Sequence, residues 1–232
     1  MRVGIDNLIH LENSIRVLCK IIKQNEQFNN PLSEYTLRRE LVACILGSQV
    51  RYEMASTALR RIERAGLLKD KWWSVSEELF ETMIFKELSR SDLVTDSNWC
   101  YRFPKKRARQ LAKARDAIAE KSLIERVLSY NEPKKIRRQL VSEITGIGPK
   151  QASMFIRNIG ISYDLAILDT HVLQYLSIKK VLDQEQMRVS TISAYEKTES
   201  VVIKYADSLG YPIGYLDWAI WATMRAAREL SL

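Results

Sequence analysis

The chain has 232 residues, of which 46% are hydrophobic, so it can fold as one large domain or two small ones. Its 36 lysines and arginines against 28 aspartates and glutamates leave a formal net charge of +8, which favours a polyanionic partner such as a nucleic acid. No stretch approaches the roughly 18 consecutive apolar residues of a membrane span, and the charged first residues are unlike a signal peptide. A membrane protein and a secreted protein are therefore both disfavoured.

Apolar residues recur at spacings of three and four along most of the chain, which is the period of an amphipathic helix. Sustained alternation is almost absent, so we predict an all-α protein. In chain order, helices are expected near residues 6–24, 34–47, 51–66, 75–89, 104–121, 123–130, 133–144, 149–159, 170–178, 190–209 and 214–229.

The three cysteines, Cys19, Cys44 and Cys100, are far apart and form no CxxC pair. They support neither a disulfide framework nor a zinc or iron–sulfur site, and we interpret them as small buried apolar residues. The two histidines are too few for a metal site of their own. No metal and no cofactor is therefore expected.

The stretch TGIGPKQASM joins two predicted helices through a turn that contains Gly146 and Gly148. Two glycines separated by one residue let backbone N–H groups converge, and the helix that starts at Pro149 adds unpaired donors and its positive dipole end. Such a turn can hold an anion, and a DNA phosphate is the natural candidate in a basic protein. We therefore predict a helix–hairpin–helix that grips the sugar–phosphate chain.

Lys150 stands in the first turn of the second hairpin helix. The dipole end and a partly dry cleft would favour a neutral, nucleophilic amine suited to Schiff-base chemistry, whereas a solvated lysine would bind phosphate as a point charge. Further along, LDTHV places Asp169 between an apolar run and a new helix. This carboxylate can cap its helix and also face Lys150 across a cleft.

Together, GIGPKQAS and LDTHV resemble the helix–hairpin–helix, Gly/Pro-rich loop, Asp superfamily of DNA glycosylases. LVACILGSQV, YRFPKKRARQLAKAR and LDWAIWATMR follow the order found in the archaeal and bacterial 8-oxoguanine DNA glycosylase/AP lyases of the second class. The resemblance implies that Lys150 attacks C1′ of the damaged nucleotide. It also implies that Asp169 helps to deprotonate Lys150 and stabilises the developing sugar cation. A Schiff base and β-elimination would then nick the strand 3′ to the lesion.

Ser48 and Gln49 follow the helix that ends near Gly47, where the chain can turn. Gln49 could be ordinary polar surface. The resemblance implies instead that its side chain enters the duplex and fills the gap left by the extruded base. We assign Ser48 to the base pocket.

The stretch YRFPKKRARQLAKAR carries many lysines and arginines and no acidic residue. A charge run is usually a solvated face, but without counter-charges a phosphate-contacting role is favoured, and we assign Lys105 and Arg107 to DNA binding. The predicted basic surface also includes Arg102, Lys106, Arg109, Lys113, Arg115, Lys134, Lys135, Arg137 and Arg138.

The stretch LDWAIWATMR places Asp217, Trp218 and Trp221 on about one turn of helix. Two tryptophans at this spacing suit a hydrophobic core as well as a base platform. The resemblance implies that Trp221 lines the pocket and stacks on the purine, and that Asp217 contacts either the base or the helix terminus. Relatives tend to end in a lysine that reaches into the pocket, whereas Leu232 stands last here.

The resemblance also implies a two-lobed all-α glycosylase fold with a cleft between the lobes. Residues 34–162 would form a six-helix barrel lobe with the hairpin, and residues 1–33 with 163–232 the second lobe. The expected partner is double-stranded DNA with a damaged base, bound by a monomer without an obligate protein partner, at the nucleoid in the cytoplasm or in a nucleus.

Two alternatives remain open. An endonuclease III-like glycosylase for oxidised pyrimidines shares the lysine and the aspartate, but it usually carries a C-terminal four-cysteine cluster, and no cysteine follows Cys100. A non-catalytic helix–hairpin–helix protein would bind DNA without nicking it.

Overall fold

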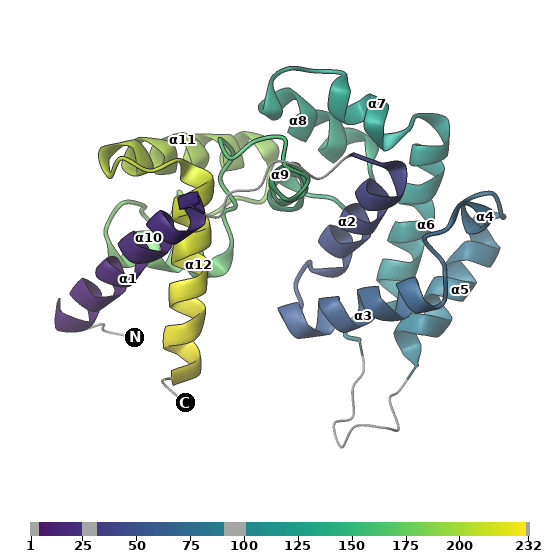
Figure 1. The fold of residues 1–232 in the computed structure, drawn as a ribbon, viewed down its shortest axis with the longest axis horizontal. Helices are drawn as coiled ribbons and strands as arrows, with labels where there is room; N and C mark the ends of the chain where they lie inside the picture. Colours follow the sequence, from purple (N-terminus) through teal and green to yellow (C-terminus); the bar gives the residue numbers. More distant parts are fainter. Residues whose placement is uncertain (1–4, 25–31, 91–100, 231–232) are drawn as a thin grey trace. The chain divides into compact units, whose positions relative to one another are not determined.

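The computed structural model describes residues 5–24, 32–90 and 101–230, and within these ranges the chain forms twelve α-helices and no β-strand (Figure 1). The prediction of an all-α protein is confirmed. The helices are α1 (Ile5–Gln24), α2 (Glu34–Leu46), α3 (Tyr52–Arg64), α4 (Asp70–Trp73), α5 (Glu77–Ser89), α6 (Pro104–Glu120), α7 (Leu123–Leu128), α8 (Pro133–Glu143), α9 (Pro149–Asn158), α10 (Thr170–Ile178), α11 (Ile192–Ser208) and α12 (Ile213–Leu230).

Each expected helix is present with its ends shifted by no more than one or two residues. Only α4 was not predicted. This single turn carries Trp73, whose ring meets Phe80 edge-on at 6.1 Å and whose indole N–H donates to the Leu67 carbonyl at 3.3 Å. Tertiary packing of one large side chain, rather than a periodic pattern, therefore accounts for the additional turn.

The chain divides into two compact units by its internal contacts. We call Pro31–Ile159 the central unit, which contains α2 to α9. We call Met1–Asn30 with Gly160–Leu232 the terminal unit, which contains α1 and α10 to α12. Each unit is described by itself below.

Helix α2 organises the central unit because it packs against α3, α6, α7 and α9. Its start is fixed by a capping box, in which Ser33 Oγ accepts from the Thr36 N–H at 3.2 Å and Thr36 Oγ1 accepts from the Ser33 N–H at 3.1 Å. Neighbours on several sides explain why its apolar residues do not form a single stripe. The buried ones are Leu37, Leu41, Val42, Cys44, Ile45 and Leu46.

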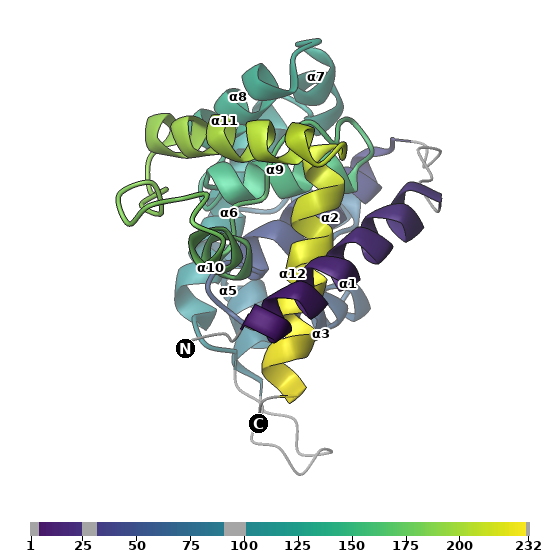
Figure 2. The same cartoon turned by 90° about the vertical axis from the view of Figure 1, so that its left-hand side faces the viewer.

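Helix α12 organises the terminal unit, where it contacts α1, α10 and α11 (Figure 2). Its first turn approaches residue Tyr163 closely, and the Gly214 N–H donates to the Tyr163 carbonyl at 2.9 Å. A Cβ atom at Gly214 would lie 2.7 Å from that carbonyl oxygen, so only glycine permits this approach. The contact holds α12 against the chain that leads towards α10.

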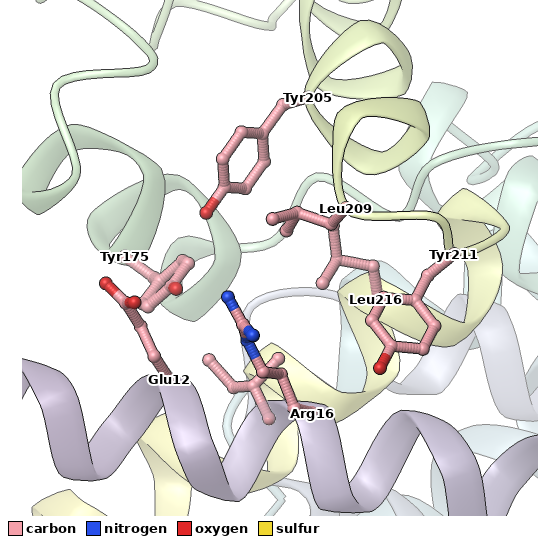
Figure 3. A pocket seen from close by; sticks show the side chains of 8 residues that line it. Glu12, Arg16, Tyr175, Tyr205, Leu209, Tyr211 and Leu216 are labelled. Atoms are coloured by element: carbon pink, nitrogen blue, oxygen red, sulfur yellow. The ribbon is translucent and has the colours of Figure 1, made fainter.

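A small hollow in the terminal unit is lined by Glu12 and Arg16 of α1, Tyr175 of α10 and Tyr205 of α11, among others (Figure 3). Its volume of about 20 Å³ suits roughly one water molecule, so it is far too small for a nucleobase. Burial raises the pKa of the Tyr175 hydroxyl, and a hydrogen bond with Tyr205 adds to the rise.

Two of the three predicted buried cysteines are confirmed. Cys19 and Cys44 are fully buried, whereas Cys100 lies outside the described residues. Burial raises the pKa of the Cys19 thiol to about 11, and the charge of Asp217 adds to the rise. Among the described helices, none combines the length and the hydropathy needed to cross a membrane.

Candidate active site

The glycine turn joins α8 to α9, which pack against each other as a helical hairpin. Gly146 has φ +95°, and a Cβ atom there would lie 3.1 Å from Cβ of Gln110 on α6. Gly148 is extended, with φ −103° and ψ 178°, and serves as the N-cap of α9. Only Gly146 therefore requires glycine for its backbone conformation, while Gly148 leaves the start of α9 without a capping side chain.

The start of α9 has the chemistry of an anion-binding helix N-terminus. No side chain caps it, and its described first turn contains no acidic residue. Pro149 has no N–H, and the N–H groups of Lys150 and Gln151 precede the first intrahelical bond, in which Ala152 donates to the Gly148 carbonyl at 2.9 Å. Two backbone donors and the positive dipole end thus point out of the turn.

Lys150 is half-buried at the second position of α9, a helix that packs against α2. Its charge acts on Cys44 of α2. Burial raises the pKa of the Cys44 thiol well above its ordinary value, a nearby Glu40 adds to the rise, and the charges of Lys150 and Arg157 oppose it. Glu40 also accepts from Asn158 Nδ2 at 2.7 Å, which links the C-terminal end of α9 to α2.

The last residue of α2 and the three residues that follow it, 46–49, include Ser48 and Gln49, and we call this segment the Gln49 loop. Gln49 is exposed and adopts φ 63°, a left-handed conformation that L-residues with side chains seldom take. The prediction had placed the turn at Gly47, which is right-handed with φ −72°. The strained residue is therefore the one whose side chain was predicted to enter the duplex.

Two buried side chains hold the carbonyls of the Gln49 loop. The Tyr101 hydroxyl donates to the Leu46 carbonyl at 2.6 Å, and Arg107 Nη2 donates to the Ser48 carbonyl at 2.5 Å. Arg107 also donates to Gln110 Oε1, and Gln110 is the residue that packs beneath Gly146. One arginine thus connects the Gln49 loop to the floor of the glycine turn.

This contact corrects the assignment of Arg107 to phosphate binding. Its side chain is only 2% exposed, because it lies on the inward face of α6 with every hydrogen bond directed at the protein. Arg115 and Arg137 are buried in the same way, and Arg137 Nη1 donates to Ser153 Oγ at 3.1 Å. Arg109 lies 3.7 Å from Glu81, so the basic run is partly compensated by another helix.

The exposed members of the predicted basic surface lie on α6, on α8 and just before α6. Lys105 is exposed, as expected for a residue that contacts DNA. The other exposed members are Arg102, Lys106, Arg109, Lys113, Lys134, Lys135 and Arg138.

Asp169 belongs to the terminal unit, where it forms the N-cap of α10. Its Oδ1 accepts from the Val172 N–H at 2.9 Å, and its backbone is extended with φ −90° and ψ 175°. The capping role is confirmed. One carboxylate oxygen is used by the cap, and the side chain remains half-buried rather than enclosed.

A family model described as 8-oxoguanine DNA glycosylase matches residues 19–211. The chain belongs to the 8-oxoguanine DNA glycosylase family. Among curated relatives, the 8-oxoguanine DNA glycosylase/AP lyase of Metallosphaera sedula is 31% identical, over 89% of this chain and 91% of the relative. The enzyme of the same name from Korarchaeum cryptofilum is 29% identical, over 94% of this chain and 96% of the relative.

Solved structures of this family share the fold. The 8-oxoguanine DNA glycosylase of Thermotoga maritima is 26% identical, with a TM-score of 0.70 over 93% of this chain and 94% of that one. The 8-oxoguanine glycosylase/lyase of Methanocaldococcus jannaschii, in complex with a 15mer DNA that contains 8-oxoguanine, is 25% identical with a TM-score of 0.63. That match covers 93% of this chain and 89% of the other.

In this glycosylase family member, Asp217 is only 1% exposed. Its Oδ2 accepts from the Ile167 N–H at 2.6 Å. Asp217 was predicted to contact the base or the helix terminus, and the structure shows it in contact with buried backbone instead. Trp221 is half-buried, with the Arg225 guanidinium 5.4 Å from its ring centre. Its stacking on a purine stays a prediction, while Trp218 is 43% exposed and is not a core residue.

Sequence reasoning missed the side chains that hold irregular backbone. Tyr101 was quoted only within a basic motif, and Tyr195 and Glu199 of α11 were not singled out. All three are fully buried. A tyrosine and a glutamate four residues apart on the apolar face of a helix were the available signal, because such polar groups are buried only when they are paired.

Proposed function

We propose that the chain is a bifunctional base-excision repair enzyme that removes 8-oxoguanine from double-stranded DNA and then nicks the strand. Family membership supports the reaction. The observation that carries the residue assignment is a half-buried lysine, Lys150, in the first turn of a helix whose N-terminal donors are free to bind phosphate. A hairpin that only bound DNA would need the donors but not the amine.

The proposed chemistry has two steps. The Lys150 amine attacks C1′ as the glycosidic bond breaks and the base leaves, and the opened sugar becomes a Schiff base with Lys150. Loss of a C2′ proton then breaks the bond from C3′ to its oxygen, which nicks the strand. Asp169 accepts the proton that Lys150 must lose and stabilises the positive charge that develops on the sugar.

For this chemistry, we infer that the central and terminal units are the two lobes of the glycosylase and that Lys150 and Asp169 meet in the cleft between them. Extrusion of the base costs a few kcal/mol, which backbone contacts and DNA bending must offset. The turn at Gly146 and Gly148 and the exposed Lys105 would contact phosphates. Gln49 would fill the gap in the duplex.

The base would enter a pocket that includes Ser48 and Trp221. Ser48 is half-buried, and its carbonyl is occupied by Arg107, which leaves its hydroxyl as the group available to a ligand. The half-buried indole ring of Trp221 would stack on the purine.

Borohydride trapping on a duplex that contains 8-oxoguanine tests the assignment of Lys150. Wild type should form a covalent adduct, and Lys150→Gln should form none, because reduction requires the Schiff base. Lys86→Gln, at an exposed lysine of α5 outside the predicted basic surface, is the matched control and should trap as well as wild type. Trapping by Lys150→Gln at the wild-type level would show that another amine is the nucleophile.

Asp169→Asn tests the carboxylate without removing the cap, because the asparagine amide oxygen also caps helices well. We expect the rate constant of base removal to fall by about 10²–10⁴-fold while thermal stability changes little.

A panel of duplexes with 8-oxoguanine or oxidised pyrimidines distinguishes the proposed function from the endonuclease III-like alternative, which predicts removal of the oxidised pyrimidines. Binding without nicking on every duplex would favour the non-catalytic hairpin protein.

A further inference from the structure

The residues that lead to Asp169 run as a segment without regular secondary structure through the core of the terminal unit. Leu165, Ala166, Ile167 and Leu168 are all buried, and we call residues 165–169 the Asp169 segment. Such a segment has no helical hydrogen bonds of its own, and the described part of the chain contains no strand that could pair with it. The buried N–H and C=O groups of this segment must therefore find other partners.

Side chains of α11 supply most of these partners. Glu199 Oε1 accepts from the Ala166 N–H at 3.0 Å. The Tyr195 hydroxyl donates to the Ala166 carbonyl at 2.7 Å and accepts from the Leu168 N–H at 3.0 Å. Tyr195 and Glu199 are both 0% exposed, so these bonds are shielded from water.

The N–H groups of Ile167 and Asp169 are also paired. The Ile167 N–H donates to Asp217 of α12, and the Asp169 N–H donates to the Ile167 carbonyl at 2.9 Å. The three N–H groups of residues 166–168 thus all end on side chains from α11 or α12. These contacts fix the backbone directly before Asp169, and the N-cap bond to Val172 fixes the carboxylate itself.

Two carboxylates buried against backbone are a costly way to hold a segment, because charged groups lose their hydration on burial. A purely structural link could use a shorter helix-to-helix connection with its backbone exposed to water. The arrangement instead determines where α10 begins, and with it where Asp169 stands. A displacement of about 1 Å in a reacting group can cost on the order of 10²-fold in rate.

We propose that Tyr195 and Glu199 are positioning residues for Asp169. Their hydrogen bonds to Ala166 and Leu168 fix the position of the Asp169 carboxylate relative to the reacting sugar. The inference rests on the proposed role of Asp169. Neither residue touches the DNA in this proposal, since both lie inside the core of the terminal unit.

Tyr195→Phe removes the hydroxyl that spans the Asp169 segment. The matched control is Tyr175→Phe, because Tyr175 is a similarly buried tyrosine of the same unit whose hydroxyl bonds with Tyr205 at the small hollow (Figure 3). Tyr195→Phe should lose more thermal stability than Tyr175→Phe, because its hydroxyl has two buried backbone partners, so both rate constants are measured well below the two melting temperatures. We expect only Tyr195→Phe to lower the single-turnover rate constant of base removal, by about tenfold or more, with the Kd for the duplex within about twofold of wild type.

The Asp169→Asn background separates positioning from a general loss of structure. If Tyr195 acts through Asp169, Tyr195→Phe should lower the rate constant by less than about twofold in that background, whereas a general structural effect would persist. Glu199→Gln keeps an oxygen that accepts from the Ala166 N–H, so its rate constant should stay nearer to wild type than that of Glu199→Leu. This pair tests the proposal if Tyr195→Phe does not fold.

Equal rate constants for Tyr195→Phe and Tyr175→Phe would overturn the inference, as would an undiminished effect of Tyr195→Phe in the Asp169→Asn background. A wild-type protein that neither releases 8-oxoguanine nor forms a borohydride adduct would instead overturn the proposed function. The two failures are therefore distinguishable in one set of measurements.

Discussion

The Gln49 loop and the Asp169 segment are both irregular pieces of backbone that carry proposed site residues, and buried side chains of opposite chemistry hold them. The Gln49 loop directs carbonyls at an arginine and a tyrosine. The Asp169 segment directs N–H groups at two carboxylates and a tyrosine. In both, a tyrosine hydroxyl serves as one of the partners.

The difference follows from which backbone groups each segment leaves without a partner. The Gln49 loop begins at the C-terminal end of α2, where the last carbonyls lack intrahelical partners and need donors. The Asp169 segment is irregular backbone before the first turn of α10, so its buried N–H groups have no helical or strand partner and need acceptors. In each segment, the buried side chains therefore match the backbone groups that local structure leaves unpaired.

The largest expected effect is on the Gln49 loop. Arg107→Met keeps most of the side-chain length but leaves the Ser48 carbonyl and Gln110 Oε1 without their donor. Because buried acceptors that lose a charged donor are costly, we expect the free energy of unfolding to fall by about 2–4 kcal/mol in urea denaturation. The slope of log K for DNA binding against log[salt] should not change, since Arg107 does not reach a phosphate.

Lys105→Met is the matched control for Arg107→Met, two residues away on the exposed side of α6. Its stability should stay within about 0.5 kcal/mol of wild type, while the slope of log K against log[salt] falls in magnitude by about 1. A change of slope in Arg107→Met and none in Lys105→Met would reverse the two assignments.

Sequence patterns predicted what local chemistry determines. Apolar spacing gave every helix except α4, the glycine turn was found at Gly146, and the cap at Asp169 was found from its place before a helix. Each of these features depends on residues within one or two turns of itself. The local sequence was therefore sufficient.

The same reasoning misplaced Arg107 and Asp217, because their partners are distant in sequence. Arg107 binds a carbonyl 59 residues away and Asp217 an N–H 50 residues away. A charged residue type suggests a ligand contact, and nothing in the neighbouring sequence shows that a backbone group elsewhere in the chain will provide the partner. The direction of such a side chain is determined only when the units have folded.

A smaller effect is expected at the floor of the glycine turn. Gly146→Ala puts a side chain at φ +95° and against Gln110, so the free energy of unfolding should fall by about 1–2 kcal/mol. Gly148→Ala is the matched control, because its φ of −103° suits any residue and its nearest neighbour is the flexible end of Gln151. Equal losses in the two variants would show that the positive φ is not the source of the cost.

The smallest effect is a gain in stability in the Gln49 loop. Gln49 holds φ 63°, which glycine adopts without cost, so Gln49→Gly should raise the free energy of unfolding by about 0.5–1 kcal/mol. The same change in the other segment, Asp169→Gly, should lower it by a few tenths of a kcal/mol, because it removes a cap from a backbone with φ −90°. Opposite signs for one substitution would separate a strained segment from one held without strain.

The rate of base removal by Gln49 variants shows whether the backbone strain at Gln49 serves the function of the protein. Gln49→Gly and Gln49→Ala both lack the side chain proposed to fill the duplex, so both should remove 8-oxoguanine more slowly than wild type. Only the glycine variant relieves the backbone, so only it should gain stability. If Gln49→Gly gained stability and kept full activity, the left-handed residue would not serve base extrusion, because natural proteins retain such strain where function requires it.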